Sequence, residues 1–132
     1  MTLPKFLLLI LFGIAVLVSC NSMDKYKKDL LSDDVTTICN ASYKLGEARD
    51  TSAVKLLLTK ILDPRRSTNL KYKGLCVAYC RTGALKKISG LDFGRKIDQF
   101  DPDTTAVNFY LDWAVRQGYL KGKNEIDIYY FK

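Results

Sequence analysis

The four cysteines, Cys20, Cys39, Cys76 and Cys80, are the residues whose chemistry stands out in this chain. Thiols and thiolates bind metals, act as nucleophiles and form disulfides or thioethers. The chain contains no histidine, which excludes a Ser-His-Asp triad, a Cys-His pair and any His-ligated metal site. General acid-base catalysis would fall to carboxylates or lysines alone. We therefore predict a protein that is not an enzyme and that uses no metal, cofactor or small-molecule substrate.

Cys20 follows a segment with the proportions of a secretory signal. Lys5 is the only charged residue before Asp24, and residues 6–18 are apolar apart from the small Gly13. As a helix this apolar run would be roughly 20 Å long, which is too short for a hydrocarbon core of about 30 Å. A permanent transmembrane helix is therefore the weaker interpretation. The run ends in the tetrapeptide Leu17-Val18-Ser19-Cys20.

This tetrapeptide resembles the lipobox of bacterial lipoproteins. The resemblance implies that residues 1–19 are removed as a signal peptide and that Cys20 is acylated with palmitate. It also implies a location in the cell envelope, lipid-anchored outside the cytoplasm, at the outer membrane or the outer face of the plasma membrane. The alternatives are an ordinary signal peptide with a chance cysteine and an uncleaved anchor.

The remainder is expected to form a lipidated tether, residues 20–32, and one domain, residues 33–132, because it is too short for two comfortable cores. The tether contains several lysines, which either favour an anionic lipid surface or are merely solvated. The three cysteines of the domain either pack as buried thiols or include one disulfide from Cys39 to Cys76 or Cys80.

Hydrophobic spacing predicts an all-α domain. The clearest pattern is Val54, Leu57, Leu58, Ile61 and Leu62, which recur at helical positions and precede Asp63-Pro64. The expected helices cover residues 34–46, 51–62, 70–82, with Gly83 as a C-cap, a short 84–88, and 101–118, begun by Asp101-Pro102. Residues 125–131 alternate and predict a short terminal strand without an evident partner.

Residues 34–90 resemble short HEAT-like repeats. In that pattern a glycine ends one helix, an aspartate caps the next, and paired leucines fill the seam between stacked helices. The matching positions are Ala41, Leu45, Gly46, Asp50, Ala53, Val54, Leu57 and Leu58, closed by Leu62-Asp63-Pro64. The resemblance implies a short stack of helical hairpins with the C-terminal helix as a cap. An ordinary small helical bundle is the alternative.

Basic residues between Pro64 and Gly90 have no acidic neighbour in sequence. The HEAT-like resemblance places Lys71, Lys73 and Arg81 on or beside the binding face, with Arg65 and Arg66 on the adjoining turn. Such a patch would attract an acidic protein, lipid headgroups or a cell-wall polymer, unless it is only a solvated face. Nucleic acid is not expected, because the predicted location lies outside the cytoplasm.

These features predict a membrane-anchored, non-catalytic protein-interaction module of the cell envelope with an acidic partner. The alternative is a structural accessory subunit of an envelope complex, docked through its C-terminal segment.

Overall fold

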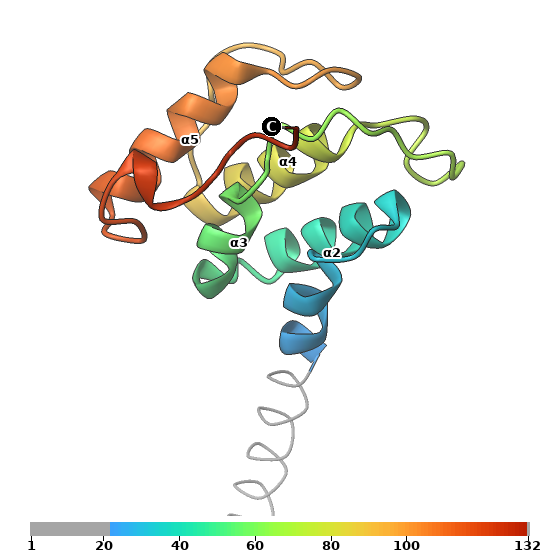
Figure 1. The fold of residues 1–132 in the computed structure, drawn as a ribbon, viewed down its shortest axis with the longest axis horizontal. Helices are drawn as coiled ribbons and strands as arrows, with labels where there is room; N and C mark the ends of the chain where they lie inside the picture. The colour runs from blue at the N-terminus through green and yellow to red at the C-terminus, as the bar shows by residue number, and fades with distance from the viewer. Residues whose placement is uncertain (1–21, 132) are drawn as a thin grey trace, which may run out of the picture.

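The computed structural model describes residues 22–131 and shows an all-α fold (Figure 1). Residues 22–29 are helical, and no strand occurs in the described part. No helix among these residues is long and apolar enough to cross a membrane. The predicted signal peptide and Cys20 lie outside the described residues. The elements that follow are α2 (Val35–Glu47), η1 (Thr51–Ala53), α3 (Val54–Leu58), α4 (Val77–Ser89), α5 (Thr104–Arg116) and η2 (Lys123–Glu125).

Aspartates begin three of these elements, because a carboxylate oxygen accepts a backbone N–H that the first helical turn leaves unpaired. Asp34 accepts from the Thr37 N–H at 2.8 Å, and Asp50 accepts from the Ser52 N–H at 3.0 Å. α5 begins later than predicted, with Asp103 rather than Asp101 as its cap. The Asp103 carboxylate accepts the Ala106 N–H at 3.1 Å, whereas the Asp101 carboxylate pairs with Arg66 instead.

The central packing joins α2 to α4. The two helices run in the same direction, because Cys39 and Cys80, which are bonded, lie in the first half of each helix and Glu47 and Lys87, which pair, lie near the C-terminal ends. They approach closely at Gly46, where a Cβ atom would lie only 2.9 Å from the Ala84 Cα atom. Gly46 is therefore required by helix packing.

α3 is shorter than the predicted helix 51–62. It ends at Leu58, and the chain then turns through Lys60, whose φ of 55° is left-handed. The side chains of Leu57 and Leu58 are buried, as the hydrophobic pattern predicted.

α4 replaces the two predicted helices 70–82 and 84–88. Residues 70–74 are turns instead, because Lys73 and Gly74 have left-handed φ values of 45° and 75° that no helix accommodates. The prediction that Gly83 ends a helix was also wrong: Gly83 lies inside α4, whose C-cap is Gly90 with φ 68°.

The predicted tether 20–32 is partly a piece of the folded domain. Met23 and Tyr26 pack against the core, and Leu30 is only 1% exposed. Their spacing places them on one face of the helix over residues 22–29 and the turn after it. The chain therefore enters the core before residue 33.

The predicted terminal strand is an extended segment without a ladder. Asp127 and Ile128 accept backbone hydrogen bonds from the Lys60 N–H at 2.7 Å and the Leu62 N–H at 3.0 Å. Their partner segment is the turn after α3, which offers no straight edge for further pairing. The alternation itself is real, because Ile126 and Ile128 pack on the core while Tyr129 and Phe131 are exposed.

Candidate binding groove along α2 and α4

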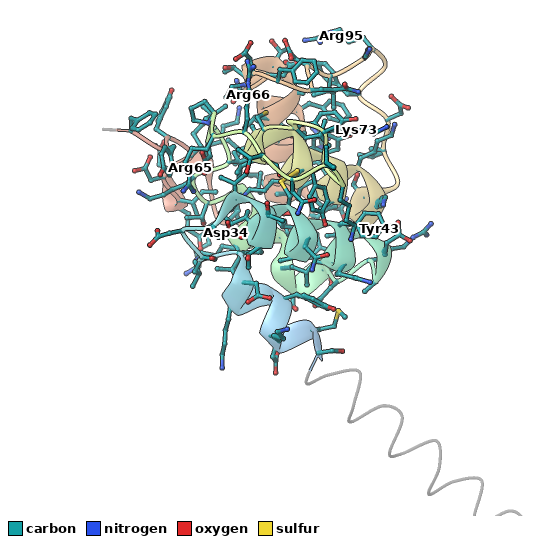
Figure 2. The ribbon with its side chains drawn as sticks, turned by 90° about the vertical axis from the view of Figure 1, so that its right-hand side faces the viewer. Asp34, Tyr43, Arg65, Arg66, Lys73 and Arg95 are labelled. Atoms are coloured by element: carbon teal, nitrogen blue, oxygen red, sulfur yellow. A yellow bond between two sulfur atoms is a disulfide. The ribbon has the colours of Figure 1, made fainter. Side chains whose placement is uncertain are left out.

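The predicted basic residues do not form one face. Arg65 donates to the Asp63 carboxylate at 2.8 Å and stacks over the Tyr130 ring. The hydrogen bond to Asp63 raises the pKa of Arg65. Arg66 pairs with Asp101 at 3.3 Å. Figure 2 shows Arg65 and Lys73 on opposite sides of the molecule. Asp63 directly precedes the sequence window that contains no acid, and the fold brings Asp101 from the loop before α5 to Arg66, so both arginines are neutralised.

Arg81 is a structural residue, and its predicted place on a binding face was wrong. It is only 5% exposed, and burial lowers its pKa to about 10. Its guanidinium donates to the carbonyl oxygens of Leu56, Thr59 and Leu30, each at 2.8 Å. These carbonyls lie at the C-terminal ends of α3 and of the helix over residues 22–29, where a cation is favourable.

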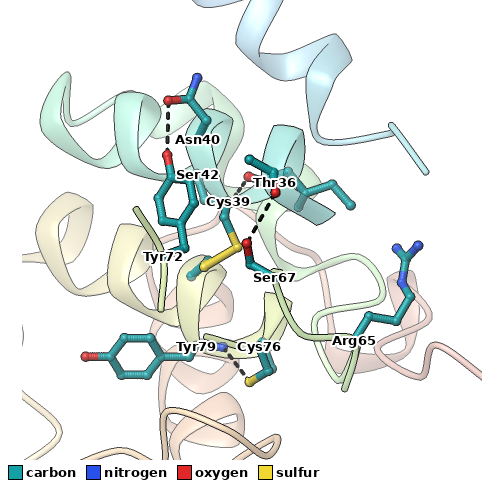
Figure 3. Close-up of a disulfide and its surroundings, with 12 residues drawn as sticks. Thr36, Cys39, Asn40, Ser42, Arg65, Ser67, Tyr72, Cys76 and Tyr79 are labelled. Carbon is teal, nitrogen blue, oxygen red and sulfur yellow. Dashed lines mark hydrogen bonds between the residues drawn. A yellow bond between two sulfur atoms is a disulfide. The ribbon is translucent and has the colours of Figure 1, made fainter. Parts of the chain in front are cut away.

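A groove with three tyrosines opens beside the disulfide. We call it the tyrosine groove. It has a volume of about 220 Å³, and its walls come from α2, the turn before α4, and α4 itself. Figure 3 shows Tyr72 beside the bond between Cys39 and Cys80, whose Cα atoms are 5.2 Å apart. The lining residues are Cys39, Tyr43, Tyr72, Leu75, Tyr79, Cys80, Gly83, Ala84 and Lys87.

Hydrogen bonds hold the walls of the tyrosine groove in place. The Tyr72 hydroxyl donates to the Asn40 side-chain oxygen at 3.1 Å. The Thr36 and Ser67 hydroxyls are 3.2 Å apart and tie the turn to α2 (Figure 3). The groove is thus pre-organised across segments that are distant in the sequence.

Lys87 covers one end of the groove. Its ammonium lies 4.3 Å from the centre of the Tyr43 ring and also pairs with Glu47. The hydrogen bond from Lys87 lowers the pKa of Glu47, which keeps that carboxylate ionised. Tyr43 remains 46% exposed, so its ring is available for contact.

A second hollow of about 190 Å³ adjoins the first on α4, and we call it the Phe93 hollow. It shares Tyr79 and Gly83 with the tyrosine groove. Its remaining lining residues are Lys86, Asp92, Phe93, Arg95, Lys96, Ile97 and Gln99.

Gly83 lies between the two hollows, and the packing of the domain does not require a glycine there. A Cβ atom placed on it would meet no atom within 4 Å, in contrast to Gly46. Glycine inside a helix costs about 0.5–1 kcal/mol relative to alanine. A bare backbone at this surface allows another molecule to approach closely.

Cys76 does not contribute a reactive group to the groove. It is buried, its sulfur accepts the Tyr79 N–H at 3.4 Å, and burial raises the pKa of its thiol. Among the described residues, no group of three or more cysteines, aspartates or glutamates is arranged to hold a metal ion. The side chains that line the groove offer aromatic and apolar contact surface.

A further hollow, of about 570 Å³, lies within the loop before α5. All of its lining residues fall between Arg95 and Thr104, and Arg95 closes the loop through Asp103 at 2.7 Å. The other elements of the fold contribute nothing to it, so it carries less weight than the tyrosine groove.

No protein-family model, curated protein or solved structure matches this chain.

Sequence reasoning missed Tyr43, Tyr72, Tyr79 and Gly83. Of the predicted residues, the fold brings Cys39 and Cys80 together in the groove and places Lys71 at its edge, 5.3 Å from the Tyr72 ring. Tyrosines scattered along a sequence give no signal by themselves, and Gly83 was interpreted as a helix end.

Proposed function

We propose that this chain is a membrane-anchored lipoprotein of the cell envelope that acts as a non-catalytic interaction module and binds a partner protein through the tyrosine groove. The observation that carries the proposal is the pre-organised groove of Tyr43, Tyr72 and Tyr79 beside a helical glycine that packing does not require. Tyrosine is enriched at protein interfaces because it offers a large apolar ring and a polar end.

The size of the groove favours a protein partner. At about 220 Å³ it is smaller than the 300–1,000 Å³ of typical small-molecule sites. It holds an anchoring side chain of a partner more readily than a complete metabolite. The proposed anchor is the acylated Cys20, supported by the short apolar segment and the lipobox-like Leu17-Val18-Ser19-Cys20.

We also propose that the helices form a short HEAT-like stack, and the parallel pair α2 and α4 supports this. Each helix has 13 residues, and each is followed along the chain by a further helix, α3 or α5. In repeat stacks, equivalent helices of successive units lie side by side.

The test is cross-linking in cells from a photoreactive residue at Tyr43. We expect a discrete protein adduct in the membrane fraction, lost when Gly83→Leu fills the groove and retained in Asn108→Leu, which puts the same side chain on the exposed surface of α5. Cys20→Ala should release the protein from membranes or leave an unprocessed precursor. Normal processing and membrane retention of that variant would refute the anchor, and an adduct indifferent to Gly83→Leu would refute the groove.

The exposed C-terminal aromatics favour a second candidate, a structural accessory subunit docked through its C-terminal segment. Tyr129 and Phe131 are 59% and 70% exposed. Removing residues 129–132 should then dissociate the protein from a stable complex. The same deletion should leave the Tyr43 adduct intact if the groove is the interface.

A further inference from the structure

We propose that the occupant of the tyrosine groove and the Phe93 hollow is a short acidic segment of a partner protein, which inserts two apolar side chains and crosses Gly83 in an extended conformation. This inference rests on the proposed function and specifies the chemistry of the partner.

The two hollows provide places for two side chains. One is walled by Tyr43, Tyr72 and Leu75, and the other contains Phe93 and Ile97. They adjoin each other, since both include Tyr79 and Gly83. Alternate side chains of an extended peptide are about 6.6 Å apart on one side, a spacing suited to adjoining pockets.

Gly83 provides the crossing point for the main chain of the peptide. It lies where the two hollows meet, and the space above its missing Cβ atom is open. Any larger residue would separate a bound chain from the floor. The peptide model therefore accounts for a helical glycine that the packing of the domain leaves unexplained.

The charges around the hollows favour an acidic segment. Five cations lie at or beside the two hollows, and three of them are paired: Lys86 with Asp92, Lys87 with Glu47 and Arg95 with Asp103. The remaining two, Lys71 and Lys96, have no ion pair within the described part of the chain. Lys73, exposed on the same turn as Lys71, has none there either. In Figure 2, Tyr43, Lys73 and Arg95 lie along one side of the molecule.

An acidic peptide would thus meet an apolar floor with an excess of positive charge at its edges. The charges should mainly accelerate association, whereas the two buried side chains should slow dissociation. Because the contact is small, we expect a transient complex.

The experiment screens a display library of random short peptides against the full chain, held in detergent micelles with its disulfide intact. We expect the enriched peptides to carry net negative charge and two apolar residues. Gly83→Leu should weaken their binding more than about tenfold, as filling a central pocket does at interfaces. Leucine is a better helix former than glycine, so thermal melts should show that the variant remains folded.

Two matched controls separate the groove from general effects. Asn108→Leu adds the same apolar side chain on α5 and should leave peptide affinity unchanged. Lys96→Glu should slow association by about threefold to tenfold at low salt, whereas Lys28→Glu, the same charge change on the helix over residues 22–29, should have little effect.

The proposal is overturned if no peptide is enriched, if the enriched peptides are neutral or basic, or if Gly83→Leu does not weaken them. It is also overturned if vesicles of phosphatidylglycerol bind in a Gly83-dependent manner and the peptides do not, because the surface would then recognise lipid. A Gly83-dependent protein adduct at Tyr43 in cells, together with a failed peptide screen, would leave the interaction module standing and refute only the acidic peptide.

Discussion

The three cysteines of the described chain have two different roles. Cys39 and Cys80 join α2 to α4, whereas Cys76 caps the start of α4 with its sulfur. The sequence left open whether a bridge forms and whether Cys76 or Cys80 would bond to Cys39. The choice between these two cysteines depends on where α4 begins. Once α4 starts at Val77, Cys80 faces α2 and Cys76 occupies the cap.

Thiol labelling provides the first prediction. In the native oxidised protein, Cys76 should resist alkylation, because it is buried and its pKa is raised. Denaturation without reductant should expose Cys76 alone among these three, and reductant should expose all three. Peptide mapping by mass spectrometry identifies each labelled residue. Labelling of Cys39 or Cys80 before reduction would contradict the bridge.

Arg81 provides the second prediction. Arg81→Met should lower the free energy of unfolding by at least about 3 kcal/mol, because each buried carbonyl left without a donor costs about 1–3 kcal/mol. The affected carbonyls belong to Leu30, Leu56 and Thr59. Denaturant melts measure the loss, and hydrogen exchange should show opening at the ends of two helices.

The matched control for Arg81 is Arg116→Met, which removes an exposed arginine from α5. It should change the stability by no more than about 0.5 kcal/mol. Equal effects of the two substitutions would show that the buried hydrogen bonds of Arg81 contribute little.

At the scale of elements, the helix start at Asp103 makes stability dependent on acid pH. The hydrogen bonds from Arg95, above all, hold the pKa of Asp103 below its usual range. Because the folded pKa is lower than the unfolded value of about 3.9, the unfolded chain binds the proton more readily. The stabilisation is complete above the unfolded pKa and is lost as the pH falls through the folded pKa.

The third prediction follows from that sign. The Tm of the wild type should fall as the pH is lowered below about 4, and Asp103→Asn should flatten part of this dependence. Asparagine is an equally good helix cap but does not titrate and does not form the ion pair with Arg95. Parallel pH profiles for the two proteins would contradict a role for Asp103 in acid stability.

Local signals explain which elements were predictable. α2 was predicted to within one residue at each end because its cap, Asp34, and its apolar stripe are adjacent in sequence. α4 was predicted with the wrong bounds, because left-handed backbone at Lys73 and Gly74 separates it from Leu70, and leucine and lysine at that point favour a helix by composition. Leu70 is instead 91% exposed on the turn.

The tyrosine groove could not be predicted for a different reason. Its walls come from α2, the turn before α4, and α4, and they meet only after α2 packs on α4. The predicted basic face was wrong because Asp63, just before the acid-free window, pairs with Arg65, and Asp101 reaches Arg66 only in the folded chain.

At the scale of the whole molecule, the disulfide joins residues 41 positions apart and encloses α3. The fourth prediction is that replacing both Cys39 and Cys80 by alanine lowers the stability by about 2–4 kcal/mol, as bridges that close long loops do. Denaturant melts of the double variant and of the wild type measure it. A double variant as stable as wild type would show that the packing of α2 on α4 does not depend on the bridge.

Combined with the proposed acylation of Cys20, the helix over residues 22–29 would limit where this protein can operate. Only Asn21 separates Cys20, the proposed point of acylation, from the first described helical residue, and Leu30 is already held by Arg81. Eight helical residues span roughly 12 Å, so the domain has a short reach and little slack. Under the proposed anchor at Cys20, a partner would have to come to the bilayer surface, and tethering at that height would raise its effective concentration there. Lengthening the segment with a flexible insert would extend the reach and dilute that advantage.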